Sequence, residues 1–410
     1  MLRRSSILLM LVSITAILFG ALAYTPAQAD EATAWAINVN NLRSGPARKF
    51  AVLSTLQPNT EVVLEARTND TSWILVHTKD GANRGWGATP LFKLAPTVKL
   101  YSLPVSTEEV GPGSKPGDAP PASGQPVDPS KLPVYQLPVP PLPNDIPSGA
   151  IRAPILPVIT PRIRSYMRTV VEKGKTLGNN LRVFSKVGDC HTDHPLFFNG
   201  IGNGVYNLGK YSSLKEIIDY YSVSPRPGAG NSFNTASKAA HSAYSSGAVL
   251  DWQLADPGVC QQEETPLRCE YRLSKPAVAI IMFGVVDVMV MTPQQFNLHM
   301  RIIVRDSMDH GVVPILSTAA ENASDPAKAR LFNQIVVKVA QEMSVPLINL
   351  QGALAPLPNK GLDADGIHLS RTADLDQAAV FNDTNLQYGY TMRNLVTLEA
   401  LQLVYHQILN

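Results

Sequence analysis

The chain has little charge of either sign and no block of basic residues. Charged residues make up 17% of its 410 residues, and the formal net charge is +2 at pH 7. Nucleic-acid-binding surfaces need a concentrated positive field, so the sequence gives no reason to expect a nucleic acid as partner. Internal repeats are also missing, which argues against a repeat architecture.

Long apolar runs are missing beyond the N-terminus. The N-terminus begins with a positively charged segment, Met1–Arg4, which is followed by an almost continuously apolar run, Ile7–Tyr24. A small-x-small motif, Ala27–Ala29, comes after this run. This order is typical of a secretory signal peptide, so we predict that residues 1–29 are removed by cleavage after Ala29. The alternative is an uncleaved membrane anchor, because the apolar run approaches the length that spans a bilayer. With cleavage, the mature chain is expected to be soluble and secreted.

Cysteine is scarce, and its three positions differ in kind. Cys260 and Cys269 are close in sequence within a loop-like run, and we expect them to form a disulfide in an exported chain. Cys190 is left as a free thiol. A lone cysteine is often a buried small apolar residue, but this one follows directly after Gly188-Asp189, which argues against that interpretation.

A proline-rich segment divides the chain into two parts. Prolines and small polar residues crowd residues 98–150, which predicts an extended linker without a fold of its own. A proline motif that binds a partner is the alternative. A single core rarely keeps growing past about 250–300 residues, so we expect one domain at residues 30–97 and a second at residues 151–410.

The first of these domains is expected to be a small all-β barrel. Short strand-like runs alternate with turn signals along residues 30–97. The runs Val39–Pro46, Trp73–Val76 and Gly85–Gly87 resemble the bacterial SH3-like domain. That resemblance implies a module that binds peptidoglycan or wall peptides, or that accompanies an envelope enzyme, and therefore an association with the cell envelope.

The tryptophans of this domain allow two interpretations. Trp35, Trp73 and Trp86 either line a ligand groove or fill the core of the barrel, and aromatic residues of small barrels are more often core.

From residue 151 onward, buried apolar runs alternate with helical patterns. Strands separated by helices indicate parallel βαβ units, so the fold class is α/β, a three-layer sandwich with a parallel sheet. The expected strands are Leu181–Val187, Ala277–Phe283, Val312–Leu316 and Pro346–Leu350, and the expected helices include Pro161–Gly174, Pro293–His310 and Asp325–Met343.

Three short motifs carry the chemistry of this domain. Cys190 follows Gly-Asp at the end of the first strand, and residues 284–287 form Gly-x-x-Asp at the end of the second. Active residues of such sheets lie at the carboxyl ends of strands. Near the C-terminus, Asp365 precedes His368 by three residues. In that arrangement a carboxylate can orient the imidazole, while its other nitrogen faces a nucleophile as general base.

The order of these motifs resembles the SGNH hydrolase superfamily of GDSL-like lipases and esterases, with its flavodoxin-like sheet, over roughly residues 175–410. The resemblance implies an ester hydrolase or acyltransferase in which Cys190 replaces the nucleophilic serine, His368 is the base and Asp365 its partner. Its substrates would be acyl esters on glycans or lipids. The oxyanion and substrate pocket would be formed by Gly188, Asp189, His191, Gly284, Val286 and Asp287.

Two departures from the family pattern leave catalysis open. Val286 stands where the family has an asparagine that donates to the oxyanion, and losing such a donor costs about 10²–10³ in turnover. A thiol at Cys190 is more acidic than a hydroxyl but larger, and a misplacement of about 1 Å costs around 10²-fold. The alternative is therefore an inactive protein that binds carbohydrate or cell-wall ligands. The family's second-block glycine has two candidate locations, Gly247 and residues 234–240.

Metal-ligand residue types also cluster around the thiol. Cys190, His191, Asp193 and His194 lie within five residues, but adjacent ligands on one turn cannot all converge on one ion. We therefore expect no metal and no cofactor.

Overall fold

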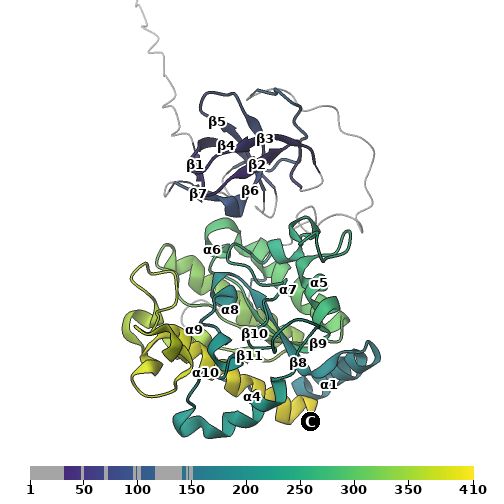
Figure 1. Ribbon diagram of the computed structural model, residues 1–410, viewed down its shortest axis with the longest axis vertical. Helices are drawn as coiled ribbons and strands as arrows, with labels where there is room; N and C mark the ends of the chain where they lie inside the picture. Colours follow the sequence, from purple (N-terminus) through teal and green to yellow (C-terminus); the bar gives the residue numbers. More distant parts are fainter. Residues whose placement is uncertain are drawn as a thin grey trace, which may run out of the picture. The chain divides into compact units, whose positions relative to one another are not determined.

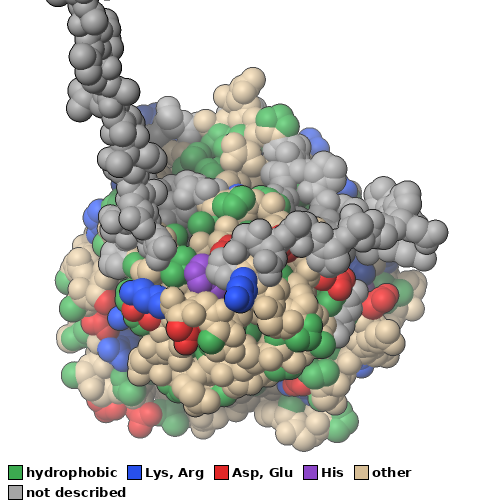
Figure 2. Space-filling view, turned by 90° about the horizontal axis from the view of Figure 1, so that it is seen from above, with side chains coloured by type: hydrophobic (Ala, Val, Ile, Leu, Met, Phe, Trp, Pro, Cys, Tyr) green, Lys and Arg blue, Asp and Glu red, His purple; other side chains and the backbone are tan. Residues whose placement is uncertain are grey.

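The computed structural model describes residues 32–47, 50–68, 73–95, 98, 103–115, 141–144, 146 and 151–410. The signal peptide predicted at residues 1–29 and most of the linker predicted at 98–150 lie outside these residues. None of the helices within the described ranges has the length and apolar character needed to cross a bilayer. On the face that Figure 2 shows, side chains of both charge signs are interspersed.

Residues 33–94 form an antiparallel sheet of seven strands in the order β3-β2-β6-β5-β4-β1-β7 (Figure 1). β1 and β2 alternate buried and more exposed side chains, because successive residues of a strand point to opposite faces. The segment is built of strands; that it forms a separate small barrel domain, and that it is like the SH3-like domain, stay predictions. The strands are β1 (Thr33–Ala36), β2 (Asn40–Arg43), β3 (Val52–Leu56), β4 (Glu61–Arg67), β5 (Trp73–Thr78), β6 (Arg84–Ala88) and β7 (Phe92–Leu94).

Residues 104–110 hydrogen-bond to β4 and to the residue that follows β2. The amide of Arg67 donates to Pro104 O at 3.0 Å, and the amide of Val110 donates to Ser44 O at 2.7 Å. Trp86 is fully buried, and its indole N–H donates to Glu108 O at 2.8 Å. At least this tryptophan therefore belongs to the core rather than to a groove.

Residues 151–410 are built on a parallel sheet of four strands in the order β11-β10-β9-β8. All seven residues of β9 are buried, which requires that both faces of the sheet be covered. The α/β class and the parallel sheet are thus as predicted. The strands are β8 (Asn180–Gly188), β9 (Pro276–Met282), β10 (Val313–Ser317) and β11 (Leu347–Ile348).

The fourth strand is shorter than the expected run Pro346–Leu350. The side chain of Asn349 accepts a hydrogen bond from Gly352 N and so caps the helix that begins at Leu350. An asparagine that satisfies a free helical N–H favours the helix start over continued strand, even in an apolar run.

Three long helices begin where a capping residue precedes a proline. Thr160, Thr292 and Asp325 cap α1, α7 and α8, and each is followed by proline, whose fixed φ suits the first helical turn. α7 and α8 pack against each other and against β10, whereas α10 packs against α4 and β11. The helices are α1 (Pro161–Thr176), α2 (Cys190–Asp193), α3 (Asn199–Gly202), α4 (Lys215–Tyr221), α5 (Pro266–Ser274), α6 (Asp287–Val290), α7 (Pro293–Asp309), α8 (Pro326–Met343), α9 (Leu350–Leu354) and α10 (Gly389–Val404).

The remaining helical segments of the described residues are short. They are η1 (Thr89–Leu91), η5 (Gly209–Leu214), η6 (Ala248–Leu250), η7 (Trp252–Leu254), η8 (Pro358–Gly361), η9 (Leu375–Ala379), η10 (Asn385–Gln387) and η11 (Tyr405–Leu409).

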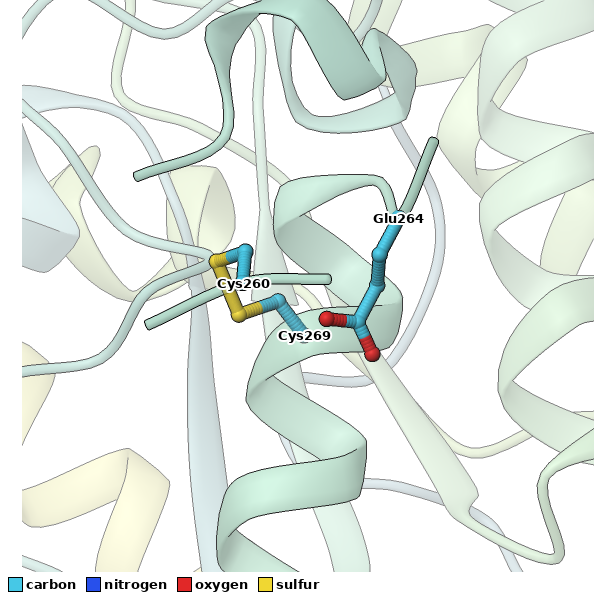
Figure 3. Close-up of side chains that lie close together, drawn as sticks. All are labelled: Cys260, Glu264 and Cys269. Atoms are coloured by element: carbon cyan, nitrogen blue, oxygen red, sulfur yellow. A yellow bond between two sulfur atoms is a disulfide. The ribbon is translucent and has the colours of Figure 1, made fainter. Parts of the chain in front are cut away.

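The expected disulfide is confirmed. Cys260 and Cys269 are bonded, with their Cα atoms 5.3 Å apart, and the bond ties the loop before α5 to the helix itself (Figure 3). Cys190 is the free cysteine of the described residues.

Candidate active site at the carboxyl end of the parallel sheet

The Gly-Asp-Cys motif forms the turn that ends β8 and starts α2. Gly188 passes so close to the next strand that a Cβ atom there would lie 2.3 Å from Met282 O, so only glycine fits. Asp189 caps α2 by accepting a hydrogen bond from His191 N at 3.2 Å. Cys190 is consequently the first residue of the helix and is half-buried.

Asp189 also joins this turn to the one that follows β9. Its side chain is fully buried, and Oδ2 accepts a hydrogen bond from Val285 N at 3.2 Å. Burial, and next the nearby carboxyl of Asp287, raise the pKa of Asp189 to about 7. Asp189 thus links the turns that follow β8 and β9, and its buried carboxyl does not face a substrate.

The Gly-x-x-Asp turn is organised by its last residue. Gly284 has a φ of 133°, which other residues rarely adopt, and its N–H donates to Asp287 Oδ2 at 3.1 Å. Asp287 Oδ1 accepts from both the backbone N–H of Ser246, at 2.8 Å, and its hydroxyl, at 2.5 Å. Burial raises the pKa of Asp287 to about 6. Val286 is half-buried, packs against the hydrophobic core and offers no hydrogen-bond donor.

Ser246 was missed in the sequence, because a serine inside a run of small residues carries no distinguishing pattern. It is fully buried and lies 3.3 Å from Nδ1 of His299, which is also buried. Burial lowers the pKa of His299 to about 3, so the imidazole is neutral. Asp287, Ser246 and His299 therefore form a buried polar chain beneath the turn.

His368 and Asp365 form a preassembled pair. Nδ1 of His368 lies 2.7 Å from Asp365 Oδ2, while Asp365 Oδ1 accepts from the backbone N–H groups of Ile367 and His368, both at 2.9 Å. Burial opposes the charge on Asp365, but these hydrogen bonds outweigh it and lower its pKa to about 2. Both side chains are 49% exposed. With Nδ1 engaged, Nε2 is the ring nitrogen available to a reacting group.

His191 lies inside the protein rather than in the mouth of the site. Its side chain is fully buried, and Nε2 accepts a hydrogen bond from Leu369 N at 3.2 Å. Its ring is 5.8 Å from that of His368, nearly perpendicular to it. Burial, and next the charge of Arg393, hold the pKa of His191 well below its usual value. A neutral His191 thus supports the loop that carries His368.

Arg393 is a second residue that no sequence pattern indicated. It projects from α10, is buried, and donates to His191 O at 2.5 Å and to Thr192 Oγ1 at 2.9 Å. Its guanidinium lies 3.7 Å from the ring centre of Phe197. Burial lowers the pKa of Arg393 to about 10, which leaves it charged at neutral pH. The first turn after β8 is therefore held by the last helix of the chain.

The thiol of Cys190 is not paired with the imidazole. No hydrogen bond joins its Sγ to His368 or to any other side chain that the structure describes. Burial, and next the charge of Asp189, raise the pKa of the thiol well above its usual value, although the backbone N–H groups of His191 and Cys190 act in the opposite direction. The resting site thus contains a neutral thiol next to a separate His–Asp pair.

The two candidate locations for a second oxyanion donor differ in position. Residues 234–240 lead into a segment that runs alongside the end of β8: Gly188 N donates to Ala239 O at 3.0 Å, and His241 N donates to Gly188 O at 3.2 Å. Gly247 lies beside Ser246, where it precedes η6. The segment at 239–241 therefore lies directly beside the turn that precedes Cys190.

The residues near Cys190 with metal-ligand side chains point to separate partners. Asp193 accepts from Ser242 N at 3.1 Å, His194 Nδ1 accepts from Leu196 N at 3.1 Å, and Nε2 of His191 is used by Leu369 N. His194 also stacks on Tyr390, with ring centres 4.7 Å apart. This arrangement does not form a ligand set.

A second group with metal-ligand side chains is Cys260, Glu264 and Cys269 (Figure 3). Its two sulfur atoms are joined in the disulfide, and Glu264 accepts hydrogen bonds from Arg272 at 2.7 and 2.8 Å. Cysteine binds a metal as a thiolate, and the sulfur atoms of a disulfide are not thiolates. This group is therefore a structural crosslink next to an ion pair.

Comparison with known proteins identifies structural relatives only. No family model matches the sequence, and no curated protein matches it. Similar solved structures include a lipase/acylhydrolase from Enterococcus faecalis, with 14% identity over 54% of this chain and 96% of the other and a TM-score of 0.36. A GDSL-like lipase from Bacteroides thetaiotaomicron has 14% identity over 58% and 98%, with a TM-score of 0.33.

An acetylxylan esterase from Geobacillus stearothermophilus has 16% identity over 53% of this chain and 93% of the other, with a TM-score of 0.32. At these identities and scores the likeness assigns no activity, so the function has to be argued from the residues of the site.

Proposed function

We propose that residues 151–410 form an SGNH-type hydrolase domain that cleaves acyl esters through Cys190, His368 and Asp365. The observation that carries the proposal is the pair of His368 and Asp365, joined at 2.7 Å and fixed by two further backbone hydrogen bonds. A carboxylate that holds an exposed imidazole in one orientation, with Nε2 free, is the arrangement that a general base requires.

The proposed reaction gives each of these residues a role. As the ester carbonyl binds at Cys190, Nε2 of His368 takes the thiol proton while sulfur attacks the carbonyl carbon. The backbone N–H of Cys190 donates to the oxyanion, and collapse of the tetrahedral intermediate releases the alcohol, which receives the proton from His368. Water, deprotonated by His368, then attacks the thioester, releases the acid and restores the thiol. Because burial disfavours a free thiolate, proton transfer has to accompany the attack.

The rest of the chain suggests where this chemistry takes place. A cleaved signal peptide would export the protein, and an SH3-like module would keep it near peptidoglycan or wall peptides. The substrates would then be acyl esters on extracellular glycans or lipids, and the residues of the site need no cofactor.

A second candidate function is ligand binding without catalysis. It is favoured by the neutral thiol, which lacks a hydrogen bond to His368, and by Val286, which supplies no oxyanion donor. In that case the site would serve as a recognition pocket for carbohydrate or cell-wall ligands.

Hydrolysis of a short-chain nitrophenyl ester by the purified protein separates the two candidates. We expect activity in the wild type that is lost in Cys190→Ala and in His368→Ala, with Ser242→Ala as a nearby control that keeps it. Activity that appears only in Cys190→Ser would mean that the scaffold is intact and the natural thiol is not a nucleophile. Silence of the wild type, of Cys190→Ser and of Cys190→Ser/Val286→Asn would contradict the proposed hydrolysis and leave ligand binding as the candidate function.

A further inference from the structure

A groove between α1, α7 and α8 lies apart from the Cys190 site. It encloses about 840 Å³. α7 and α8 lead into the amino ends of β10 and β11, and the groove is formed by the last turns of these helices, whereas Cys190 follows the carboxyl end of β8. The two sites are therefore at opposite ends of the sheet. The groove is lined by Arg162, Ser165, Tyr166, Thr169, Val170, Lys173, Arg305, Met308, Asp309, Glu342, Met343 and Ser344.

The charge available in this groove is positive. Its two acidic residues are both engaged: Asp309 pairs with Lys173 at 3.1 Å, and Glu342 pairs with Arg301 and Lys338. Arg162 and Arg305 are exposed, and neither makes an ion pair or a side-chain hydrogen bond with the residues that the structure describes. Two guanidinium groups from different helices thus line one groove without a protein acceptor, and such groups bind carboxylates and phosphates with two parallel hydrogen bonds.

The same groove has an apolar surface next to these charges. Tyr166 is 44% exposed, a large fraction for an aromatic residue, and Met308 and Met343 line the groove with it. Tyrosine offers an apolar face and a polar hydroxyl, which suits a ligand with both kinds of surface. A sugar ring has such surfaces, since its C–H face packs on an aromatic ring while its hydroxyls stay hydrated.

The groove is much larger than a simple inorganic anion needs. Sites for small organic molecules typically enclose about 300–1,000 Å³, and the groove falls within that range. A single phosphate would leave most of the groove, including the face of Tyr166, unused.

We propose that this groove binds an acidic carbohydrate. Arg162 and Arg305 hold its carboxylate or phosphate, and Tyr166 packs against a sugar ring. The site is independent of the chemistry at Cys190 and would hold a polymer or oligosaccharide at the opposite end of the domain.

Isothermal titration calorimetry with the whole protein tests this proposal. The probes are trigalacturonate, which carries carboxylates, glucose 1-phosphate, which carries a phosphate, uncharged galactotriose and inorganic phosphate. We expect trigalacturonate or glucose 1-phosphate to bind more tightly than both galactotriose and inorganic phosphate, and the stronger of the two identifies the source of the anion. Binding should weaken as the salt concentration rises.

Variants locate the binding in the groove. Arg162→Gln and Arg305→Gln should each weaken binding about tenfold, the loss of one charged hydrogen-bonding group. Tyr166→Ala should weaken binding of the sugar acid without changing that of inorganic phosphate. Arg168→Gln is the matched control, because Arg168 is an exposed arginine of α1 outside the groove.

Several results would overturn the proposal. One is that galactotriose or inorganic phosphate binds as tightly as trigalacturonate and glucose 1-phosphate. Another is that Arg168→Gln weakens binding as much as Arg162→Gln and Arg305→Gln do. A third is that neither trigalacturonate nor glucose 1-phosphate binds. Circular dichroism of each variant verifies the fold, so a loss of binding in a folded Arg305→Gln is attributable to the groove.

Discussion

Nη1 of Arg393 donates a hydrogen bond of 2.5 Å to the carbonyl oxygen of His191, 202 residues earlier in the chain. Through this bond the C-terminal helix holds the first turn after β8, which carries Cys190. The same guanidinium also donates to Thr192 Oγ1 and lies over the ring of Phe197. The geometry of the candidate nucleophile therefore depends on a buried cation that belongs to none of the three motifs of the site.

Replacing that cation should destabilise the domain strongly. We expect Arg393→Met to lower the free energy of unfolding by about 2–4 kcal/mol, because it leaves buried acceptors at His191 O and Thr192 Oγ1 without donors. Urea denaturation measures the effect. Arg168→Met, on an exposed face of α1, should change stability by less than about 0.5 kcal/mol. Similar losses in the two variants would contradict the role given to Arg393.

The pair of His368 and Asp365 should make a contribution to stability that depends on pH. The folded state lowers the pKa of Asp365 to about 2, below its ordinary value near 3.8. The contribution is therefore present above about pH 4 and is lost as the pH falls toward 2. In thermal melts, Asp365→Asn should be less stable than the wild type at pH 6 and equal to it near pH 2. A difference that stays constant with pH would show that the carboxylate charge is not involved.

The buried carboxyl of Asp287 should have the opposite pH dependence. Burial raises its pKa to about 6, so the folded state favours the protonated form more than the unfolded state does. This contribution is complete below about pH 4 and decreases as the pH rises through 6. Melting temperatures between pH 4 and pH 8 should therefore fall less steeply in Asp287→Asn than in the wild type. Asp376→Asn, at an exposed position, should keep the wild-type slope.

Removal of the disulfide should destabilise the domain without affecting the free thiol. Cys260 and Cys269 are nine residues apart, and closing a short loop of this kind contributes about 2–3 kcal/mol in the chain-entropy model. We expect the double variant Cys260→Ser/Cys269→Ser to unfold at correspondingly lower urea concentration. Addition of a reductant should lower the stability of the wild type by the same amount and leave the variant unchanged.

An asparagine restored at position 286 should increase any serine-dependent hydrolysis. Val286 occupies the turn that Asp287 organises, and it has no donor for an oxyanion. In the Cys190→Ser background, Val286→Asn should raise kcat at least tenfold, toward the roughly 10²–10³ that one such donor contributes in a well-studied hydrolase. Met289→Asn, three residues further on at an exposed position, is the control. An unchanged kcat would mean that position 286 does not face the reacting oxygen.

Local patterns in the sequence were sufficient for much of the architecture. The four strands, the helices α1, α7 and α8 and the disulfide all follow from features within a few residues of one another, such as apolar runs, a threonine before proline, or two nearby cysteines. The pairing of Asp365 with His368 is of the same kind, since a loop of four residues brings their side chains together. The end of β11 was the exception, because one capping side chain changed strand into helix there.

Only the tertiary structure decided which residues support the site and which of its groups carry a charge. The contacts of Arg393 with His191 and of Ser246 with Asp287 join residues far apart in sequence, and no local pattern encodes them. The sequence supplied Cys190 at the right strand end, but burial and the neighbouring Asp189 determine that its thiol is neutral. Protonation depends on the charges and the solvent around a group, and those are known only once distant segments have packed together.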